Sequence, residues 1–374
     1  MKLVLKNGIK PKGMVTLPPS KSEAIRAALL LALSGEAPEK AVAGFDAPFC
    51  GDVENALAAA RELSDVYAGE SAALLRFAIP VQAALFGRIS VRADARLIKR
   101  GVEEAEECLG ISLAPDENGL IRTEAHLTAS RFLIDCSRSR QFLSGLLIAL
   151  PLLDRECEII VKNGLVSKPY AEITLRFVRL FGGRIEETET GFLTRPSVYR
   201  APERIPVTGD ASYAAVFEAM NALGGQVEIT GKGEGSLQPD AAFPALCELA
   251  DISVTDCPDL APLLAAAACA KTGDTMIHGT ARLRTKESDR EAGTVELIRS
   301  LGGSAEAGGG FITVHGTGSL SGGECDIHGD HRLAFAAAVM ALVCESPVVF
   351  EGAECAYKSA PGFIEDLKKL DLTD

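Results

Sequence analysis

Apolar residues recur with helical spacing in four stretches of the chain, and each stretch runs into glycine and then into a short alternating run. The helical stretches and the runs after them are residues 102–109 and 110–113, 171–181 and 182–185, 214–223 and 224–227, and 290–301 and 302–304. Glycine directly after the last helical turn supplies the left-handed conformation that ends a helix. The alternating runs are typical of half-buried strands. The pattern therefore predicts repeated helix–turn–strand units and an α/β fold.

Longer apolar runs and a proline-rich stretch indicate how the chain is divided. Residues 260–270 and 333–344 are too short to cross a bilayer and are predicted to form buried helices. The N-terminus alternates like a strand up to an Asn7-Gly8 turn and shows no signal peptide. Proline recurs in residues 195–207, which are expected to form an extended linker. Because 374 residues exceed one typical core, two domains are expected, with the main boundary in this linker.

Composition and charge narrow the class of protein. The chain is 47% hydrophobic and 24% charged, which is an ordinary globular composition. Its formal net charge of −13 argues against a nucleic-acid binder. The ten cysteines are scattered without a Cys-x-x-Cys pair, which predicts reduced core cysteines in a cytoplasmic protein. The five histidines have no metal-ligand spacing, so no metal is expected.

Lysine and arginine gather where loops are expected to meet helices. The segments are residues 17–26, 69–77, 95–100, 139–146, 165–170, 282–290, 329–332 and 356–363. Each alone is typical of an ordinary helix start with solvated charges. Helix N-termini beside cations also bind anions, and loop–helix junctions often carry function. So many cations at such junctions in an acidic chain indicate a small polyanionic ligand.

Six strings within these segments carry a resemblance to a known family. In chain order they are P-S-K-S-x-x-x-R, Q-F-L-S-G-L-L, L-V-S-K-P-Y, T-K-E-S-D-R, D-H-R and Y-K-S-x-P-G-F. Together, from about residue 17 to residue 363, they resemble the 5-enolpyruvylshikimate-3-phosphate synthase family. The resemblance implies a two-domain enolpyruvyl transferase fold built from repeated βαβαββ units, with the active site in the interdomain cleft. It also implies an N-terminal domain of residues 20–207 and a C-terminal domain of residues 1–19 and 208–374.

The same resemblance implies a reaction. The enolpyruvyl group of phosphoenolpyruvate would pass to the 5-hydroxyl of shikimate 3-phosphate by addition and elimination, with release of phosphate. This reaction lies on the shikimate pathway to chorismate and the aromatic amino acids. It needs no cofactor and no metal. We therefore expect a cytoplasmic monomer whose partners are these two small molecules, with no nucleic acid and no membrane.

Individual residues take their expected roles from the family's motifs. Catalytic roles fall to Lys21, to Asp259 as the base at the 5-hydroxyl, and to Glu287 as the acid and base at C3. The shikimate 3-phosphate site would comprise Lys21, Ser22, Arg26, Ser139, Arg140, Gln141, Ser167, Tyr170, Asp259, Arg282 and Lys286. The phosphoenolpyruvate site would comprise Lys21, Ala72, Arg96, Gln141, Arg290, Arg332 and Lys358. Planar guanidinium groups suit the carboxylate and phosphate of this substrate.

The chain departs from the family's pattern at several positions. Ala72 stands where the family usually has glycine, Arg140 where it has serine and Gly329 where it has asparagine. Arg282 stands four residues before the family's lysine, where another polar residue is usual. Residues 51–69 are also too few for a complete repeat unit, so one unit of the N-terminal domain is expected to be shortened. Two alternatives stay open: an inactive anion-binding paralogue, and a UDP-amino-sugar enolpyruvyl transferase.

Overall fold

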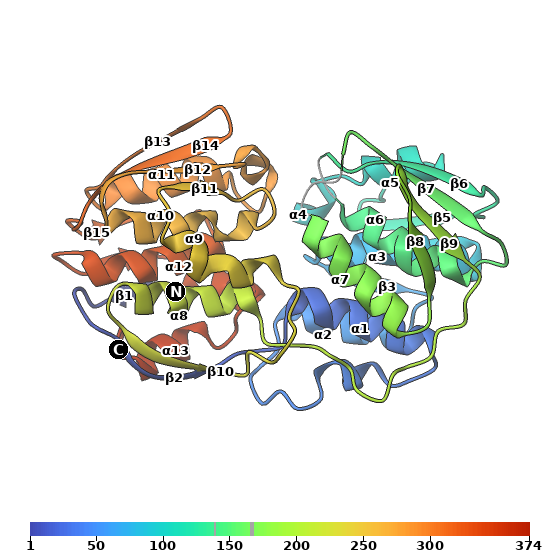
Figure 1. Cartoon of the computed structure of the whole chain (residues 1–374), viewed down its shortest axis with the longest axis horizontal. Helices are drawn as coiled ribbons and strands as arrows, with labels where there is room; N and C mark the ends of the chain where they lie inside the picture. Colours follow the sequence, from blue (N-terminus) through green and yellow to red (C-terminus); the bar gives the residue numbers. More distant parts are fainter. Residues whose placement is uncertain (138–139, 165–167) are drawn as a thin grey trace. The chain divides into compact units, whose positions relative to one another are not determined.

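The computed structural model describes residues 1–137, 140–164 and 168–374, and it divides into two compact units (Figure 1). Unit 1 comprises Met1–Ser20, Phe45–Cys50 and Thr208–Asp374. Unit 2 comprises Lys21–Gly44 and Gly51–Val207. The chain therefore begins in unit 1, forms unit 2 with a short return to unit 1 at Phe45–Cys50, and re-enters unit 1 at Thr208 after the proline-rich segment at residues 195–207.

One complete βαβαββ motif lies in unit 2. Its elements are β6 (Arg131–Asp135), α6 (Gln141–Ala149), β7 (Cys157–Lys162), α7 (Lys168–Leu180), β8 (Arg184–Glu187) and β9 (Gly191–Arg195). The sheet has the order β6-β7-β9-β8. Strands β6 and β7 are parallel, while β9 runs antiparallel to both of its neighbours.

Unit 1 repeats this topology. The corresponding elements are β11 (Asp251–Ser253), α10 (Ala261–Cys269), β12 (Thr272–His278), α11 (Arg290–Ser300), β13 (Ser304–Gly308) and β14 (Phe311–Thr317). Their sheet has the order β11-β12-β14-β13, again with one parallel and two antiparallel pairings. The repeated pattern of helix, glycine and strand in the sequence therefore corresponds to a repeated structural unit.

Two smaller sheets complete unit 1. Strand β2 (Lys12–Thr16) pairs in parallel with β10 (Gln226–Thr230), which follows α8 (Ala211–Ala222). Strand β1 (Leu3–Leu5) pairs with β16 (Val348–Phe350), whose other neighbour is β15 (Gly323–Glu324). The N-terminal strands thus belong to the same unit as the C-terminal half of the chain.

Alanine-rich helices form the core of unit 1. Every residue of α10 and of α12 (His331–Met340) is buried, which confirms the two helices predicted from the long apolar runs. Phe335 of α12 packs against Phe363, at the start of α13 (Phe363–Lys369), with ring centroids 4.7 Å apart. Small alanine side chains let these helices approach closely, and the few large rings fill the remaining space.

One predicted strand is wrong. Helix α5 (Glu103–Leu109) ends at Gly110 in the left-handed conformation, as expected, but residues 110–113 form no strand. The neighbouring sheet has only three strands: β3 (Val66–Gly69), β4 (Arg88–Ala93) and β5 (Leu120–Glu124). The backbone amide of Leu113 instead donates a hydrogen bond of 2.7 Å to the carboxylate of Glu106. Because the Leu113 amide is bonded to the Glu106 side chain of α5, it is not available for pairing with a neighbouring strand.

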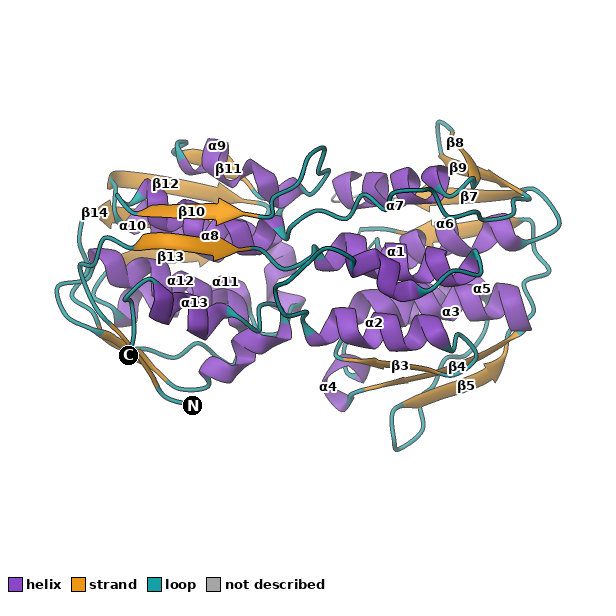
Figure 2. Ribbon diagram, turned by 90° about the horizontal axis from the view of Figure 1, so that it is seen from below, coloured by secondary structure: helices purple, strands orange, loops and turns teal. Residues whose placement is uncertain are grey.

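Among the described residues, the first two helices of unit 2 have no sheet of their own, and the shortened repeat unit stays a prediction. Helices α1 (Lys21–Leu33) and α2 (Gly51–Arg61) are joined by residues 34–50, which contain only the short 3₁₀ helix η1 (Pro38–Val42). In Figure 2, β10 crosses in front of α8 in unit 1, whereas no strand crosses in front of α1 and α2. Residues 29–31 in α1 are nevertheless fully buried, because η1 and its flanking loops cover the helix.

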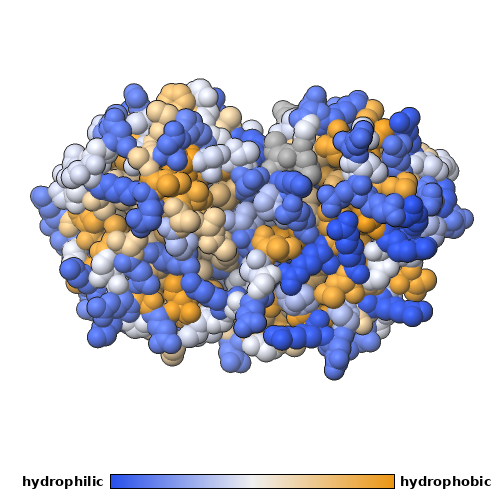
Figure 3. Space-filling model, in the orientation of Figure 1, coloured by the Kyte–Doolittle hydropathy of each residue, from blue (hydrophilic) through white to orange (hydrophobic). Residues whose placement is uncertain are grey.

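The surface is of mixed polarity. On the face shown in Figure 3, apolar residues form small separate patches among hydrophilic ones. Among the described residues, no helix is long and apolar enough to cross a membrane.

Candidate active site

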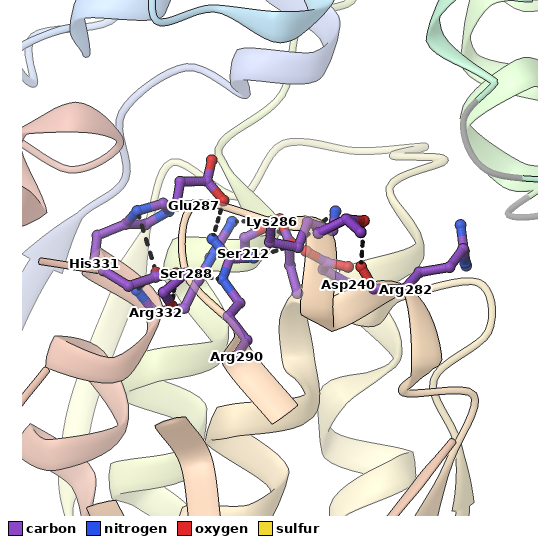
Figure 4. A network of polar contacts seen from close by, with 12 residues as sticks. Ser212, Asp240, Arg282, Lys286, Glu287, Ser288, Arg290, His331 and Arg332 are labelled. Atoms are coloured by element: carbon purple, nitrogen blue, oxygen red, sulfur yellow. Dashed lines mark hydrogen bonds and ion pairs between the residues drawn. The ribbon is translucent and has the colours of Figure 1, made fainter. Parts of the chain in front are cut away.

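The densest polar cluster of unit 1 is built around Arg290, the first residue of α11. Asp289 caps this helix by accepting a hydrogen bond of 3.0 Å from the amide of Ala292. The guanidinium of Arg290 is 1% exposed and donates to three carboxylates. They are Asp330 at 2.7 Å from Nε, Asp259 at 2.9 Å from Nη1 and Glu287 at 2.7 Å from Nη2. Figure 4 shows the contact between Arg290 and Glu287. One buried cation thus fixes the two carboxylates expected to move protons.

Three further cations surround the same carboxylates. Arg332 donates from Nη2 to Asp259 at 3.0 Å, and Lys358 donates to Glu287 at 3.2 Å. Lys286 lies 3.5 Å from Asp259. We call these residues the Arg290 cluster: Asp259, Lys286, Glu287, Arg290, Asp330, Arg332 and Lys358. With three carboxylates and four cations, the cluster is one positive charge in excess, which favours anions.

The start of helix α12 positions two members of the Arg290 cluster, Asp330 and Arg332. Asp330 caps α12 by accepting a hydrogen bond of 2.9 Å from the amide of Arg332, and it also accepts one of 3.0 Å from the hydroxyl of Ser288. Its carboxylate therefore joins the starts of α11 and α12. Among the described residues, no three His, Cys, Asp or Glu side chains are grouped as metal ligands would be.

The electrostatic setting keeps these carboxylates ionised. Burial works to raise the pKa of Asp259, but the charges of Lys286 and Arg332 hold it well below its usual range. Burial likewise opposes ionisation of Glu287, and Arg290 and Lys358 hold its pKa well below its usual range. Loss of hydration, reinforced by the nearby arginines, lowers the pKa of His331 well below its usual value, so this histidine is neutral.

In unit 2, the start of α1 carries a second group of predicted site residues. The Nζ of Lys21 lies 3.2 Å from a carboxylate oxygen of Asp52, near the start of α2. The Asp52 side chain is 9% exposed and that of Lys21 is 27% exposed, so the pair holds the lysine ammonium in place. Ser22 follows Lys21 and is half-buried.

Arg26 is placed deeper than expected for a substrate ligand. It is 4% exposed and donates to the Thr174 hydroxyl at 2.7 Å and to the Ser22 carbonyl at 2.6 Å. It also donates to the Ser144 hydroxyl at 3.3 Å and to the Tyr170 carbonyl at 3.2 Å. Loss of hydration, with a smaller effect of Arg140, lowers its pKa to about 9. Arg26 thus ties α1, α6 and α7 together; its contact with shikimate 3-phosphate stays a prediction.

Arg140 and Tyr170 form a stacked pair in unit 2. The guanidinium carbon of Arg140 lies 4.1 Å from the centroid of the Tyr170 ring. Arg140 occupies the N-cap position of α6, and Gln141 is the first residue of that helix. The predicted phosphate ligands Ser139 and Ser167 lie outside the described residues.

The other predicted residues are placed as follows. Arg96 is exposed on the short helix α4 (Ala95–Ile98). Ala72 is 9% exposed and is the first residue of α3 (Ala72–Phe86), which Ser71 caps. Arg282 donates to the Thr255 carbonyl at 2.5 Å. In Figure 4 its side chain extends away from the Arg290 cluster.

The sequence motifs give no role to two carboxylates of the site, Asp330 and Asp52, although each is a buried partner of a predicted site cation. Unit 2 also holds a buried pair of Arg76 with Glu104, 2.5 Å apart, in which Arg76 donates to the Gly101 carbonyl at 2.8 Å. An acidic residue next to a glycine at a helix start was the only signal for the two carboxylates.

Comparison with known proteins decides the family. A family model described as EPSP synthase (3-phosphoshikimate 1-carboxyvinyltransferase) matches residues 117–367. A 3-phosphoshikimate 1-carboxyvinyltransferase of Clostridium kluyveri is 30% identical over an alignment covering 99% of this chain and 97% of that protein. The chain belongs to the EPSP synthase family. The alignment spans 419 positions, more than the 374 residues present, so this EPSP synthase family member is shorter than its relative.

Further relatives agree on the family and the fold. A 3-phosphoshikimate 1-carboxyvinyltransferase of Methanocorpusculum labreanum is 34% identical over 62% of this chain and 60% of its own length. The solved structure of EPSP synthase from Acinetobacter baumannii superposes with a TM-score of 0.77 at 20% identity. It covers all of this chain and 98% of that one. The structural likeness establishes the enolpyruvyl transferase fold for this EPSP synthase family member.

Proposed function

We propose that this protein transfers the enolpyruvyl group of phosphoenolpyruvate to the 5-hydroxyl of shikimate 3-phosphate and releases phosphate. The observation that carries the proposal is the Arg290 cluster, where two ionised carboxylates are held among four cations. This reaction needs positive groups for an anionic substrate and two separate sites of proton transfer. The ten cysteines are all unbridged, which fits a cytoplasmic location.

The first half of the reaction is an addition. Asp259 accepts the proton of the 5-hydroxyl as its oxygen bonds to C2 of phosphoenolpyruvate, while C3 gains a proton from Glu287. The product is a tetrahedral intermediate in which C2 bears both the shikimate oxygen and the phosphate. In the second half, C3 returns a proton to Glu287 as the bond from C2 to the phosphate oxygen breaks. Asp259 gives the hydroxyl proton to the departing phosphate oxygen, so both Asp259 and Glu287 end as they began and the protons balance.

The substrate must compete with the protein's own carboxylates. Arg290 and Arg332 donate hydrogen bonds to Asp259, and Lys358 donates one to Glu287. When these cations bind the carboxylate and phosphate of phosphoenolpyruvate, their interactions with Asp259 and Glu287 weaken. The pKa of Glu287 then rises toward the range in which it can carry a proton. Substrate binding therefore converts a structural carboxylate into an acid.

Phosphate release tests the proposal directly. Wild-type protein mixed with both substrates should release one phosphate per product formed, and should do so only when both are present. An inactive anion-binding paralogue would show thermal stabilisation by the substrates without release. A UDP-amino-sugar enolpyruvyl transferase would release phosphate only when a UDP-amino sugar replaces shikimate 3-phosphate. Either result would overturn the proposed function.

Replacement of Arg140 by serine should weaken the binding of shikimate 3-phosphate by about fivefold, because a charge-assisted hydrogen bond exceeds a neutral one by about 1 kcal/mol. Serine is also a better helix N-cap than arginine, so lost affinity could not be attributed to a weakened α6. Calorimetric titration of the protein with shikimate 3-phosphate measures the change. Arg131→Ser, which removes an exposed arginine of the same unit, is the control. Equal affinities of wild type and Arg140→Ser would mean that Arg140 does not reach the phosphate.

Replacement of Ala72 by glycine should increase inhibition by glyphosate, an analogue that occupies the phosphoenolpyruvate site. The methyl group of Ala72 should meet the longer analogue first, and one misfitting methyl group is worth about 1–3 kcal/mol of discrimination. Inhibition constants measured at a phosphoenolpyruvate concentration near KM give the comparison. Ala73→Gly is the matched control, because it adds the same backbone freedom one residue later. Potent inhibition of the wild type, or no gain in Ala72→Gly, would show that this methyl group does not control the pocket.

A further inference from the structure

Two complementary polar atoms in unit 1 are buried without a hydrogen-bond partner. One is the acceptor Oδ1 of Asp240, and the other is the donor Nε of Arg332, and neither has a partner among the described residues. Asp240 is 1% exposed and Arg332 is 4% exposed, so solvent does not readily satisfy either atom. A buried polar group without a partner is costly and needs an explanation.

The surroundings of Asp240 are built to hold its carboxylate in one orientation. Asp240 lies in the 3₁₀ helix η3 (Pro239–Ala242), and the Ser212 hydroxyl donates to its Oδ2. Figure 4 shows this pair beside the Arg290 cluster. Gln238, the residue before η3, joins η3 to the start of α8. It accepts a hydrogen bond from the Ala211 amide at 3.0 Å and donates one to the Gly209 carbonyl at 2.8 Å. With Oδ2 occupied, only Oδ1 is left for another partner.

Asp240 and Arg332 act on the same third residue, Asp259. The negative charge of Asp240 stabilises the charged form of Arg332, and the charges of Asp240 and Asp259 repel each other. Arg332 reaches Asp259 through Nη2, and its Nε is left unused. Both carboxylates therefore stabilise the charged form of Arg332, and the hydrogen bond goes to Asp259.

We propose that Asp240 is a positioning residue that accepts the Nε–H of Arg332 when phosphoenolpyruvate draws the Arg332 guanidinium away from Asp259. Asp240 would then hold Arg332 against the substrate and leave Asp259 free to accept the proton of the 5-hydroxyl. This inference rests on the proposed function and adds a residue to which the family resemblance gave no role.

The charge state of Asp240 gives a specific readout. Burial, reinforced by Asp259, raises the pKa of Asp240 to about 6, against the opposing effects of Arg332 and Ser212. The other ionisable groups facing it are Asp210, which caps α8, and Cys257, whose pKa burial raises to about 12. On the adjoining α9 (Phe243–Cys247) the ionisable group is Cys247, whose pKa is raised by burial. Asp240 should therefore accept from Arg332 strongly at pH 7.5 and weakly at pH 5.

Asp240→Asn tests the proposal because it keeps the shape and removes the charge. We expect kcat/KM for phosphoenolpyruvate to fall roughly tenfold at pH 7.5, in line with the loss of a charge-assisted hydrogen bond. At pH 5 the difference from wild type should vanish, because wild-type Asp240 is then neutral too. The substrate phosphate also titrates near pH 6, but its effect cancels in the ratio of variant to wild type. Ser212→Ala, which removes the donor to Oδ2, should move the pH midpoint of this ratio upward.

Thermal unfolding shows whether the variant is folded and whether the charge was present. The folded pKa of Asp240 is raised above its unfolded value, so ionisation destabilises wild type as pH rises from about 4 to 6. Asp240→Asn should therefore melt at a higher temperature than wild type above pH 6 and at the same temperature near pH 4. Asp366→Asn is the control, since Asp366 is a buried carboxylate of the same unit that accepts from the Tyr213 hydroxyl. It should leave the pH dependence of kcat/KM unchanged.

Two results would overturn the role of Asp240: equal kcat/KM of variant and wild type at every pH, or the same loss at pH 5 as at pH 7.5. Failure of the proposed function looks different, because wild type itself would release no phosphate. In that case the melting temperatures of wild type and Asp240→Asn are measured with and without phosphoenolpyruvate at the two pH values. A smaller rise for Asp240→Asn at pH 7.5 would show that Asp240 supports anion binding, and an equal rise would show that it does not.

Discussion

Replacement of Glu287 by glutamine should lower kcat by about 10²–10⁴-fold, because the amide cannot give a proton to C3 or take one back. The variant should still bind both substrates, since the side chain keeps its shape. One of the two cations that contact Glu287 will then face an amide group instead of a carboxylate oxygen, so a modest change in KM is expected. Single-turnover phosphate release separates the chemical step from binding.

A second carboxylate of the same helix region provides the control for Glu287. Glu291 is buried and accepts hydrogen bonds from Thr280 and Arg284, neither of which belongs to the Arg290 cluster. Glu291→Gln should therefore retain near-normal turnover even if it melts at a lower temperature. If Glu287→Gln were as active as this control, the proton shuttle at C3 would have to be another group.

Replacement of Arg290 by methionine should abolish turnover and destabilise unit 1 by about 3–5 kcal/mol, the usual cost of removing one partner from a buried ion pair. Asp259, Glu287 and Asp330 would lose the cation that they share. The cost should depend on pH. In wild type the folded pKa values of all three carboxylates are depressed, so their stabilising contribution is present at neutral pH and is lost as pH falls through those values.

The measurement for Arg290→Met is thermal unfolding at pH 7 and at pH 4. The gap in melting temperature between wild type and variant should be large at pH 7 and smaller at pH 4, where the carboxylates of the variant take up protons. Lys2→Met is the control, because the side chains of Lys2 and of its ion-pair partner Glu324 are 55% and 83% exposed, so this pair should contribute little. A gap that does not change with pH would mean that Arg290 stabilises the unit by packing and not through these carboxylates.

Local signals in the sequence were sufficient for much of the fold. Glycine after a helix correctly marked the strands that follow α7, α8 and α11, because in each case a neighbouring strand offers a free edge. The same signal failed after α5, where Glu106 takes the Leu113 amide. A side chain that competes with a strand for one amide is a tertiary event that periodicity does not reveal.

The candidate site was predictable in its cations and less so in its carboxylates. Helix starts rich in lysine and arginine included Arg290 and Arg332, and the family resemblance gave these two residues their expected roles. Nothing in the spacing shows that Asp330, 40 residues from Arg290 in sequence, would contact it. The spacing of residues also gives no sign of Asp240, because its burial and its unpaired oxygen arise only when η3 packs on α8.

The missing sheet over α1 and α2 also affects how the protein can associate with other chains. Every open sheet has two edge strands whose unpaired amides and carbonyls can recruit another chain, and proteins need charges, prolines or bulges to prevent this. Residues 34–44 cover α1 with a 3₁₀ helix and loops and therefore present no such edge. On this face of unit 2, the absence of strands among the described residues removes a route to aggregation and domain swapping.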